Sequence, residues 1–216
     1  MPYIPEHDSV VDRELLLEFI AAHPLAMLIT HDGVMPENDL VPLVAVPDGD
    51  APSGVALIGH VARANRLWRD GMHVGKTLAS FGPVEHYISP TWYPSKQEHH
   101  RTVPTWNYLV AHAWGELRIH HDRKWVLGAV GRLTVAMERG RDEPWRMNQA
   151  PADYMDAQLE QIVGIELPVE RLVGRFKVSS HKSNADRLGA RAGVVGESGE
   201  SELTDWMAAP PQPHEQ

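Results

Sequence analysis

Apolar residues recur along the chain in short runs, and the spacing within each run predicts the element that it forms. One such run, in residues 11–22, has four apolar residues on one side of a helical wheel: Leu15, Leu16, Phe19 and Ile20. Asp12 stands where a helix N-cap belongs, and Pro24 follows the run. We therefore predict a helix here that Asp12 caps and Pro24 ends.

Shorter apolar or alternating runs predict strands. These runs are residues 25–30, 40–46, 55–60, 74–81, 106–119, 162–169 and 172–178. Asp32-Gly33 is a hairpin-type turn after the first run. Pro42 interrupts the second, which indicates an edge strand or a bulge. Gly82-Pro83 is predicted to close the fourth.

Helical patterns fall between some of these strands, at residues 62–70, 122–139 and 151–161. Residues 85–104 are rich in His, Pro and aromatic residues, and we expect a long irregular loop there, a kind of segment that is often functional. Strands in hairpins, with helices inserted late, favour a mainly antiparallel sheet with peripheral helices, an α+β fold. The chain lacks the regular alternation of strand and helix that a parallel sheet needs.

The composition changes after about Leu188, where Gly, Ser, Glu and Pro dominate. We expect a domain over residues 1–190 and a loose acidic tail over residues 191–216. Removal of this tail is expected to leave the fold intact.

The composition is that of an ordinary globular protein: 216 residues, with 43% hydrophobic and 23% charged side chains. There are no cysteines, which excludes disulfides, iron–sulfur sites and thiolate catalysis and fits a reducing cytoplasm. No apolar run is long enough to cross a bilayer, and no signal peptide core is present. We expect a cytoplasmic protein without membrane contact.

The formal net charge is −9, and residues 197–216 contain five acidic residues and no Lys or Arg: Glu197, Glu200, Glu202, Asp205 and Glu215. Proteins that bind DNA phosphates usually carry a basic excess. DNA binding by a local basic patch stays possible, but the charge does not favour it, and no helix-turn-helix pattern is evident.

Two sequence patterns suggest a phosphate-binding loop and a metal site, but their spacing does not fit either one. Gly71 to Thr77 resembles a phosphate-binding P-loop, but one residue is missing before Gly75-Lys76, and the residues that follow read as a strand. The 13 histidines include two adjacent pairs, yet no His-Glu-x-x-His or similar metal-binding spacing occurs. We predict no dedicated metal site.

Residues 59–69 carry a more informative pattern, Gly-His-Val-Ala-Arg-Ala-Asn-Arg-Leu-Trp-Arg. A strand is predicted to end at His60 and a helix to begin nearby, and helix N-termini attract anions. Arg63 and Arg66 would share a helical face, and the forked guanidinium of Arg63 suits a phosphate. A surface helix with solvated arginines explains the same residues equally well.

Aromatic residues gather around prolines in the predicted loop and just after it: Tyr87, Trp92, Tyr93, Trp106 and Tyr108. Flat rings with polar tips suit a planar cofactor or a protein interface. The alternative is a stiff loop that covers the core. Further along, residues 176–183 end a strand with several hydrogen-bond donors, a weak signal for a second anion or cofactor contact.

Several of these segments, in this order, resemble the PaiB family, known as FMN-binding negative transcriptional regulators. The segments are Tyr3-Ile-Pro-Glu-His, His23-Pro-Leu-Ala, residues 59–65, Gly82-Pro with residues 87–93, Val103-Pro-Thr-Trp-Asn-Tyr108 and Phe176-Lys-Val-Ser179. The resemblance covers residues 1 to about 188. It implies a split β-barrel like that of pyridoxamine-phosphate oxidase, with FMN bound at the interface of a homodimer.

The resemblance also implies site residues. His60, Arg63 and Asn65 would lie in the cofactor motif, with Arg63 at the FMN phosphate. The residues implied to line or approach the pocket are Trp92, Trp106, Asn107 and Lys177. The chain departs from the family pattern at three places: Arg66 replaces a proline, Ser180-His181 replaces Gln-Asn, and Asp39-Leu-Val-Pro replaces His-Leu-Pro.

Three functions therefore remain open. The first is a flavin-binding protein with a regulatory role in transcription. The second is an FMN-dependent oxidoreductase acting on a small molecule, and whether the protein is an enzyme is left open. The third is a haem protein, because piperazate synthases resemble the same family and use the histidine of the Gly-His motif as iron ligand. His60 occupies that position, so it would be the metal ligand only in this third case.

Overall fold

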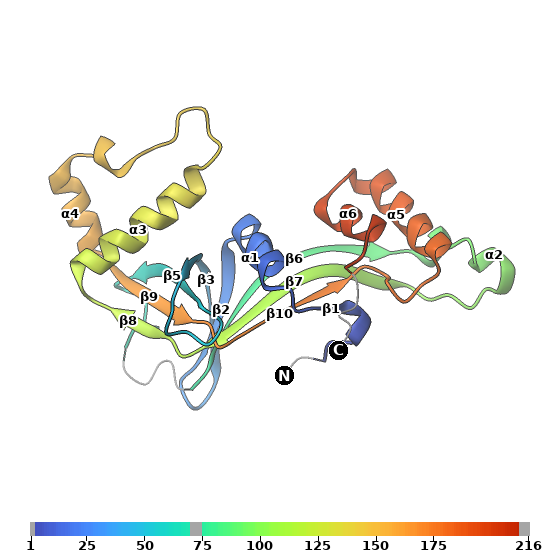
Figure 1. The fold of residues 1–216 in the computed structure, drawn as a ribbon, viewed down its shortest axis with the longest axis horizontal. Coiled ribbons are helices and arrows are strands. Elements are labelled where there is room, and N and C mark those ends of the chain that lie inside the picture. Colours follow the sequence, from blue (N-terminus) through green and yellow to red (C-terminus); the bar gives the residue numbers. More distant parts are fainter. Residues whose placement is uncertain (1–2, 70–74, 212–216) are drawn as a thin grey trace. The chain divides into compact units, whose positions relative to one another are not determined.

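The computed structural model describes residues 3–69 and 75–211 (Figure 1). The chain forms two compact units that alternate along the sequence. The first unit is Met1–Leu16, Gly82–Ala111 and Val173–Gln216, and the second is Leu17–Phe81 and His112–Leu172. Each unit is described by itself below.

The second unit contains a four-stranded antiparallel sheet with the order β4-β5-β9-β8. Its strands are β4 (Val44–Pro47), β5 (Val55–Ala62), β8 (Arg118–His120) and β9 (Ile162–Pro168). The helices α3 (Arg123–Glu138) and α4 (Ala152–Glu160), with the short 3-10 helix η3 (Met147–Gln149) between them, connect β8 to β9. Helix α3 packs against β4, β5 and β9, and α4 packs against β9.

A hairpin of β2 (Leu25–His31) and β3 (Pro36–Pro42) completes the second unit, and β2 also pairs with Leu78–Ser80 of β6 (Thr77–Ile88). Asp32 closes the hairpin turn, because its carboxylate accepts hydrogen bonds from the amides of Val34 and Met35, both 2.8 Å long. The predicted turn is confirmed. The predicted strand 40–46 is divided at Pro42: β3 ends there as an outermost strand of its sheet, and β4 begins at Val44 in the other sheet.

The first unit contains strands in the order β1-β10-β7-β6, with β1 (Ser9–Val10), β7 (Thr105–Gly115) and β10 (Arg171–Lys177). Short helices precede and connect them: η1 (Glu6–Asp8), η2 (Pro90–Trp92) and α2 (Lys96–His99). Of these, η2 and α2 lie in the segment 85–104 that was predicted to be irregular. Side chains alternate along β7 between buried and partly exposed, which confirms its predicted period of two.

Two helices, α5 (Asn184–Ser198) and α6 (Glu202–Ala208), end the described chain (Figure 1). Helix α6 packs on β10, where Trp206 meets Phe176 edge to face. Leu203 and Met207 of α6 are buried, as is Val194 of α5. The prediction of a loose tail is therefore wrong for residues 191–208, and the proposed boundary at residue 190 falls inside α5.

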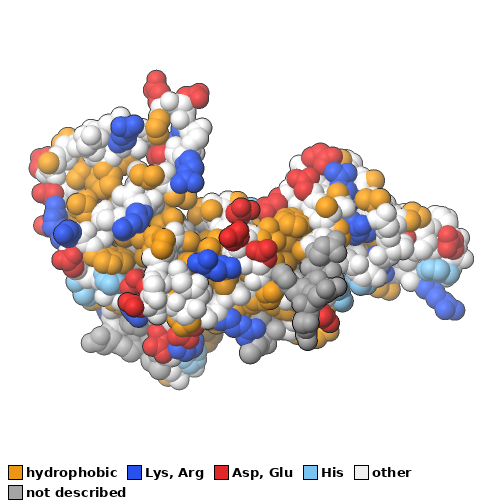
Figure 2. Space-filling view, in the orientation of Figure 1, with side chains coloured by type: hydrophobic (Ala, Val, Ile, Leu, Met, Phe, Trp, Pro, Cys, Tyr) orange, Lys and Arg blue, Asp and Glu red, His pale blue; other side chains and the backbone are white. Residues whose placement is uncertain are grey.

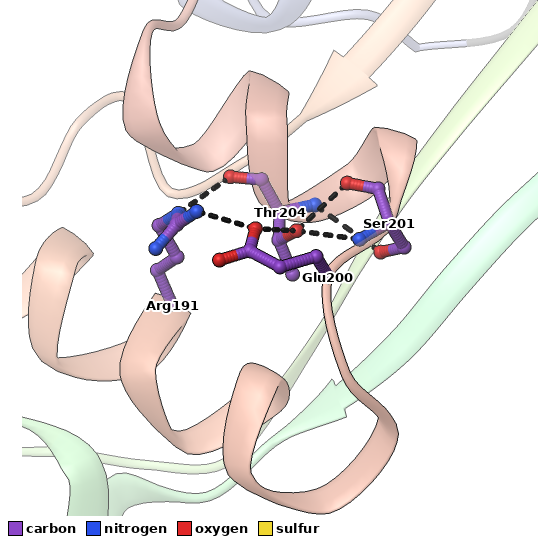
Figure 3. Close-up of polar contacts among 4 residues, drawn as sticks. All are labelled: Arg191, Glu200, Ser201 and Thr204. Carbon is purple, nitrogen blue, oxygen red and sulfur yellow. Dashed lines mark hydrogen bonds and ion pairs between the residues drawn. The ribbon is translucent and has the colours of Figure 1, made fainter.

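A polar network joins the two helices (Figure 3). Arg191 of α5 donates from Nη2 to Glu200 at 2.6 Å and from Nε to the backbone carbonyl of Thr204 at 3.0 Å. Ser201 and Thr204 form a reciprocal cap at the start of α6. Acidic and glycine-rich sequence thus folds here because a cation and a cap satisfy its polar groups.

Two other predictions need correction. Residues 62–70 were predicted to form a short helix, but β5 continues to Ala62 and the chain then turns through the described residues 63–69. The side chain of Asn65 accepts a hydrogen bond from the amide of Leu67, which replaces a helical bond. The P-loop-like residues 71–74 lie outside the described residues.

Gly82-Pro83 does not close a strand, because β6 runs through it to Ile88. In the first unit β6 is the outer strand of the order β1-β10-β7-β6, and an outer strand tolerates a residue without an amide N–H. The predicted strand 106–119 is divided into β7 and β8. Helix α1 (Arg13–Ala22) is confirmed, with Asp12 accepting from the amides of Glu14 and Leu15.

In the described part of the chain, no helix combines the length and the apolar character that crossing a membrane requires.

Candidate functional site

His60 lies near the end of β5, in a row of side chains that crosses three strands of the second unit. It stands opposite Gly164 of β9, and Gly164 stands opposite His120 of β8. The indole of Trp125 occupies the space that a side chain at Gly164 would need. This indole stacks on His120, with 3.8 Å between ring centroids and 7° between planes.

The imidazole of His60 is mostly buried, and its Nδ1 has no hydrogen-bond partner among the described residues. Burial lowers the pKa of His60 below its usual value of 6.5, because the charged ring would lose its hydration. The ring is therefore neutral near pH 7. A neutral imidazole with an unpaired nitrogen can accept a proton or bind a metal-containing cofactor.

Arg63 follows β5 and is held by backbone carbonyls. Its Nε donates to Glu160 at 2.6 Å and its Nη2 to Ile162 at 2.9 Å. The backbone carbonyl of Arg63 accepts a hydrogen bond from the Trp68 indole at 3.0 Å. These two side-chain bonds use two of the five guanidinium N–H donors, and the residue stays exposed. The charge is thus fixed in place with donors left for an anion.

Asn65 stabilises the same loop through two hydrogen bonds of its side chain. Its Nδ2 donates to Asp39 Oδ1 of β3 at 2.7 Å, and its Oδ1 accepts from the amide of Leu67 at 2.7 Å. His60, Arg63 and Asn65 lie within six residues of one another, at and just after the end of β5. Asp39 is an additional member that the sequence did not assign to the site.

The first unit places two cations around one aromatic ring. The guanidinium carbon of Arg175 lies 5.3 Å, and Lys177 Nζ 5.9 Å, from the centroid of Tyr108. Lys177 also donates to Thr105 Oγ1 at 2.7 Å. Burial first, and the charge of Arg175 second, lower the pKa of Lys177. Sequence reasoning placed Lys177 in the site but missed Arg175.

Trp106 and Asn107 point to opposite faces of β7. Trp106 is 52% exposed, whereas Asn107 is fully buried and its Oδ1 accepts from Ser179 Oγ at 3.1 Å. Tyr87 meets Trp106 edge to face at 5.9 Å. The structure therefore brings Trp106 into the same exposed face as Tyr108, but it does not bring Trp106 and Asn107 into one pocket.

A shallow apolar hollow of about 560 Å³ lies on this exposed face. Its lining residues come from β6 and β7: Pro83, Glu85, Trp106, Tyr108 and Val110. Trp92 lies elsewhere in the first unit, where its indole fills the space beside Gly193 of α5. The packing of Trp92 on this helix gives it a structural role.

Among the described residues, no three His, Asp or Glu side chains gather closely enough to hold a metal ion.

Two solved structures share this fold. The flavocytochrome Anf3 from Azotobacter vinelandii matches with a TM-score of 0.55 and 14% identity, over 78% of this chain and 69% of that one. The FAD and heme binding protein from Mycobacterium smegmatis matches with a TM-score of 0.56 and 14% identity, over 79% and 73%. Identities this low establish the fold alone, and this fold is the predicted split barrel.

The chain belongs to the family described as "Putative FMN-binding domain", whose model matches residues 2–171. One relative, the protease synthase and sporulation protein PAI 2 of Bacillus subtilis, is 25% identical over 189 residues, 86% of each chain. The resemblance to the PaiB family is confirmed. An uncharacterised protein of Emericella nidulans is 34% identical over 122 residues, which are 52% of this chain and 49% of that protein. This chain thus spans about half of the length of that relative.

Proposed function

We propose that this protein binds FMN at the end of β5, with Arg63 at the phosphate. The match of residues 2–171 to an FMN-binding family carries the proposal. The geometry of Arg63 supports it, because a guanidinium fixed on two backbone carbonyls needs little ordering when an anion arrives. Asn65 and Asp39 stabilise the loop that presents it.

FMN supplies one- and two-electron redox chemistry when it is bound, and the protein supplies orientation and charge. Arg63 neutralises the phosphate, and its contacts to Glu160 and Ile162 set its position. His60 can hold or release a proton at Nδ1, because no other described group competes for that atom. These roles fit either a flavin-dependent regulator or an FMN-dependent oxidoreductase acting on a small molecule.

A homodimer is the second part of the proposal, and exposed apolar sheet faces support it. In the second unit, Met27 and Leu40 are directly opposed on β2 and β3 and are 37% and 65% exposed. Leu25 adds a third exposed side chain on the same face, at 54%. Contiguous apolar patches of this kind typically mark protein interfaces.

We propose a role in negative regulation of transcription, which rests on the PaiB resemblance. The net charge of −9 disfavours direct binding to DNA phosphates. We therefore expect the flavin-bound dimer to act indirectly, through a protein partner or a small molecule that it converts.

Haem on His60 is the second candidate. The observation that favours it is the neutral, largely buried imidazole with an unpaired Nδ1. Two proteins with the same fold are named for haem as well as flavin chemistry. Haem would use His60 as its axial ligand.

Absorption spectra of the purified protein, recorded before and after addition of FMN or haemin, test the proposal. Saturable uptake of FMN, with a flavin spectrum that stays with the protein through gel filtration, is the expected result. A Soret band that His60→Ala abolishes, without FMN uptake, would replace flavin by haem. Uptake of neither group by a folded protein would refute both assignments. Light scattering on the same samples measures the oligomeric state.

A further inference from the structure

A long groove runs beside α3 in the second unit and has no part in the proposed flavin site. It has a volume of about 790 Å³. One wall is the strand β4 with Ile58 of β5, and the other is the face of α3 from Trp125 to Arg139. Fourteen residues of helix correspond to about 21 Å, so the groove is elongated.

Three small residues of α3 face the groove: Gly128, Gly131 and Ala136. Because they have little or no side chain, the groove stays open along this helix. Packing does not require the two glycines. A Cβ at Gly128 would lie 3.5 Å from Arg132, and a Cβ at Gly131 would lie 3.5 Å from Met147, which are ordinary contacts. Glycine inside a helix costs about 1 kcal/mol relative to alanine. An alanine would therefore fit at both positions, and its methyl group would narrow the groove.

Two arginines and one glutamate, Glu166, line the groove, whose other lining residues are apolar. Arg132 lies in α3, Arg139 directly follows the last residue of this helix, and both line the groove. Neither has an ion-pair partner among the described residues. The carboxylate in the groove, Glu166, is already engaged by His120 at 2.8 Å and Arg118 at 3.8 Å. The groove therefore offers two uncompensated positive charges.

A second hollow of about 420 Å³ continues the groove, since Val135 and Arg139 line both. It adds the exposed ring of Trp145, the side chain of Arg146 and the carboxylate of Glu138, which pairs with Arg141 at 3.3 Å. Figure 2 shows hydrophobic side chains between Lys and Arg side chains on the side of the molecule that carries α3. Together the groove and the second hollow form an elongated apolar surface with arginine side chains along it.

We propose that this groove binds an elongated apolar molecule with an anionic head group, an alkyl carboxylate or alkyl phosphate. Apolar walls accept the chain, and guanidinium groups bind either head group with paired hydrogen bonds. An extended peptide fits less well. The strand β4 that would pair with it has four residues and ends at Pro47, which lacks an amide N–H.

Calorimetric titration of the full chain with dodecanoate and dodecyl phosphate below their micelle concentrations, and with dodecanol below its solubility limit, tests the proposal. We expect saturable binding of at least one anion and at least tenfold weaker binding of the alcohol. The tighter anion identifies the head group. An absence of saturable binding, or equal binding of dodecanol, would overturn the proposal.

Three variants complete the test. Arg132→Gln combined with Arg139→Gln should weaken anion binding at least tenfold. Gly128→Leu should weaken it by filling the groove, without a lower melting temperature, because leucine favours a helix more than glycine does. Arg123→Gln is the matched control, since Arg123 lies on the same helix but pairs with Asp156 outside the groove.

Unchanged binding in both groove variants would overturn the proposal. A second alternative is that another copy of the chain covers the groove. In that case the protein would bind none of the probes, and its dimer would dissociate in the double arginine variant. FMN uptake should be the same in the groove variants as in the parent protein. The two proposals can therefore fail independently.

Discussion

Asn65 and Asp39 are joined by a hydrogen bond of 2.7 Å that ties the loop after β5 to the strand β3. The two residues are 26 positions apart, and Asp39 stands where the PaiB pattern has histidine. A carboxylate is a good acceptor for the amide of Asn65, and its charge lowers the positive potential of the arginine-rich loop. This pair therefore both orders the loop and sets its electrostatics.

Asp39→Ala should lower the free energy of unfolding by about 1–3 kcal/mol, because Asn65 loses its partner in a partly buried place. Asp39→Asn should cost less, since an amide oxygen still accepts the hydrogen bond. Urea unfolding measures both. A fall of the same size in Asp39→Asn and Asp39→Ala would show that charge, and not the hydrogen bond, stabilises the loop.

Arg63→Ala should raise the dissociation constant for FMN about 10- to 100-fold, as expected for loss of a hydrogen bond to a charged group worth about 1.5–3 kcal/mol. Fluorescence quenching of FMN measures this constant. Arg69→Ala is the control, because Arg69 is an exposed arginine of the same loop. Equal FMN affinity of a folded Arg63→Ala variant and the parent would refute the assignment of Arg63.

His60 and His112 make stability depend on pH. Burial lowers the pKa of both rings below 6.5, so the unfolded chain binds protons more readily than the folded one. The free energy of unfolding should therefore be highest above pH 7 and fall as the pH drops below about 6.5. Urea unfolding between pH 5 and 8 measures this slope.

Replacement of either histidine by glutamine should flatten the slope, and His99→Gln, at an exposed position, should not. If neither His60→Gln nor His112→Gln changes the slope of the unfolding free energy with pH, the two histidines are not the origin of the pH dependence.

Elements whose signals are local were predictable from the sequence. Asp12 and Asp122 cap their helices within three residues, and β7 alternates from one residue to the next. The helices α5 and α6 were missed because their glycines and acidic residues suggest a loose chain. They are stabilised by contacts that no local pattern encodes, such as Arg191 with Glu200.

In the candidate site, too, local motifs were predictable from the sequence, whereas pairings between distant residues were not. The motif around His60 and Arg63 identified residues that the structure places at one strand end, although the helix predicted there does not form. The pairing of Asn65 with Asp39 could not be inferred from one sequence, because it depends on how β3 and β5 are placed. The family resemblance implied Trp106 and Asn107 together, yet adjacent residues of a strand face opposite ways.

Trp92 and Gly193 supply a sharp test of how α5 is held. A Cβ at Gly193 would overlap the indole of Trp92, whereas a Cβ at Gly196, on the same helix, would meet nothing within 4 Å. Gly193→Ala should therefore lower the free energy of unfolding by about 1–3 kcal/mol through overpacking. Gly196→Ala should raise it by about 0.5–1 kcal/mol, because alanine is the better helix former.

A double-mutant cycle separates the steric effect from helix propensity. In a Trp92→Ala background the indole is gone, so Gly193→Ala should change from destabilising to neutral or stabilising. Chemical unfolding of the four proteins measures the coupling. If Gly193→Ala costs the same free energy with and without the indole, Trp92 does not set the position of α5.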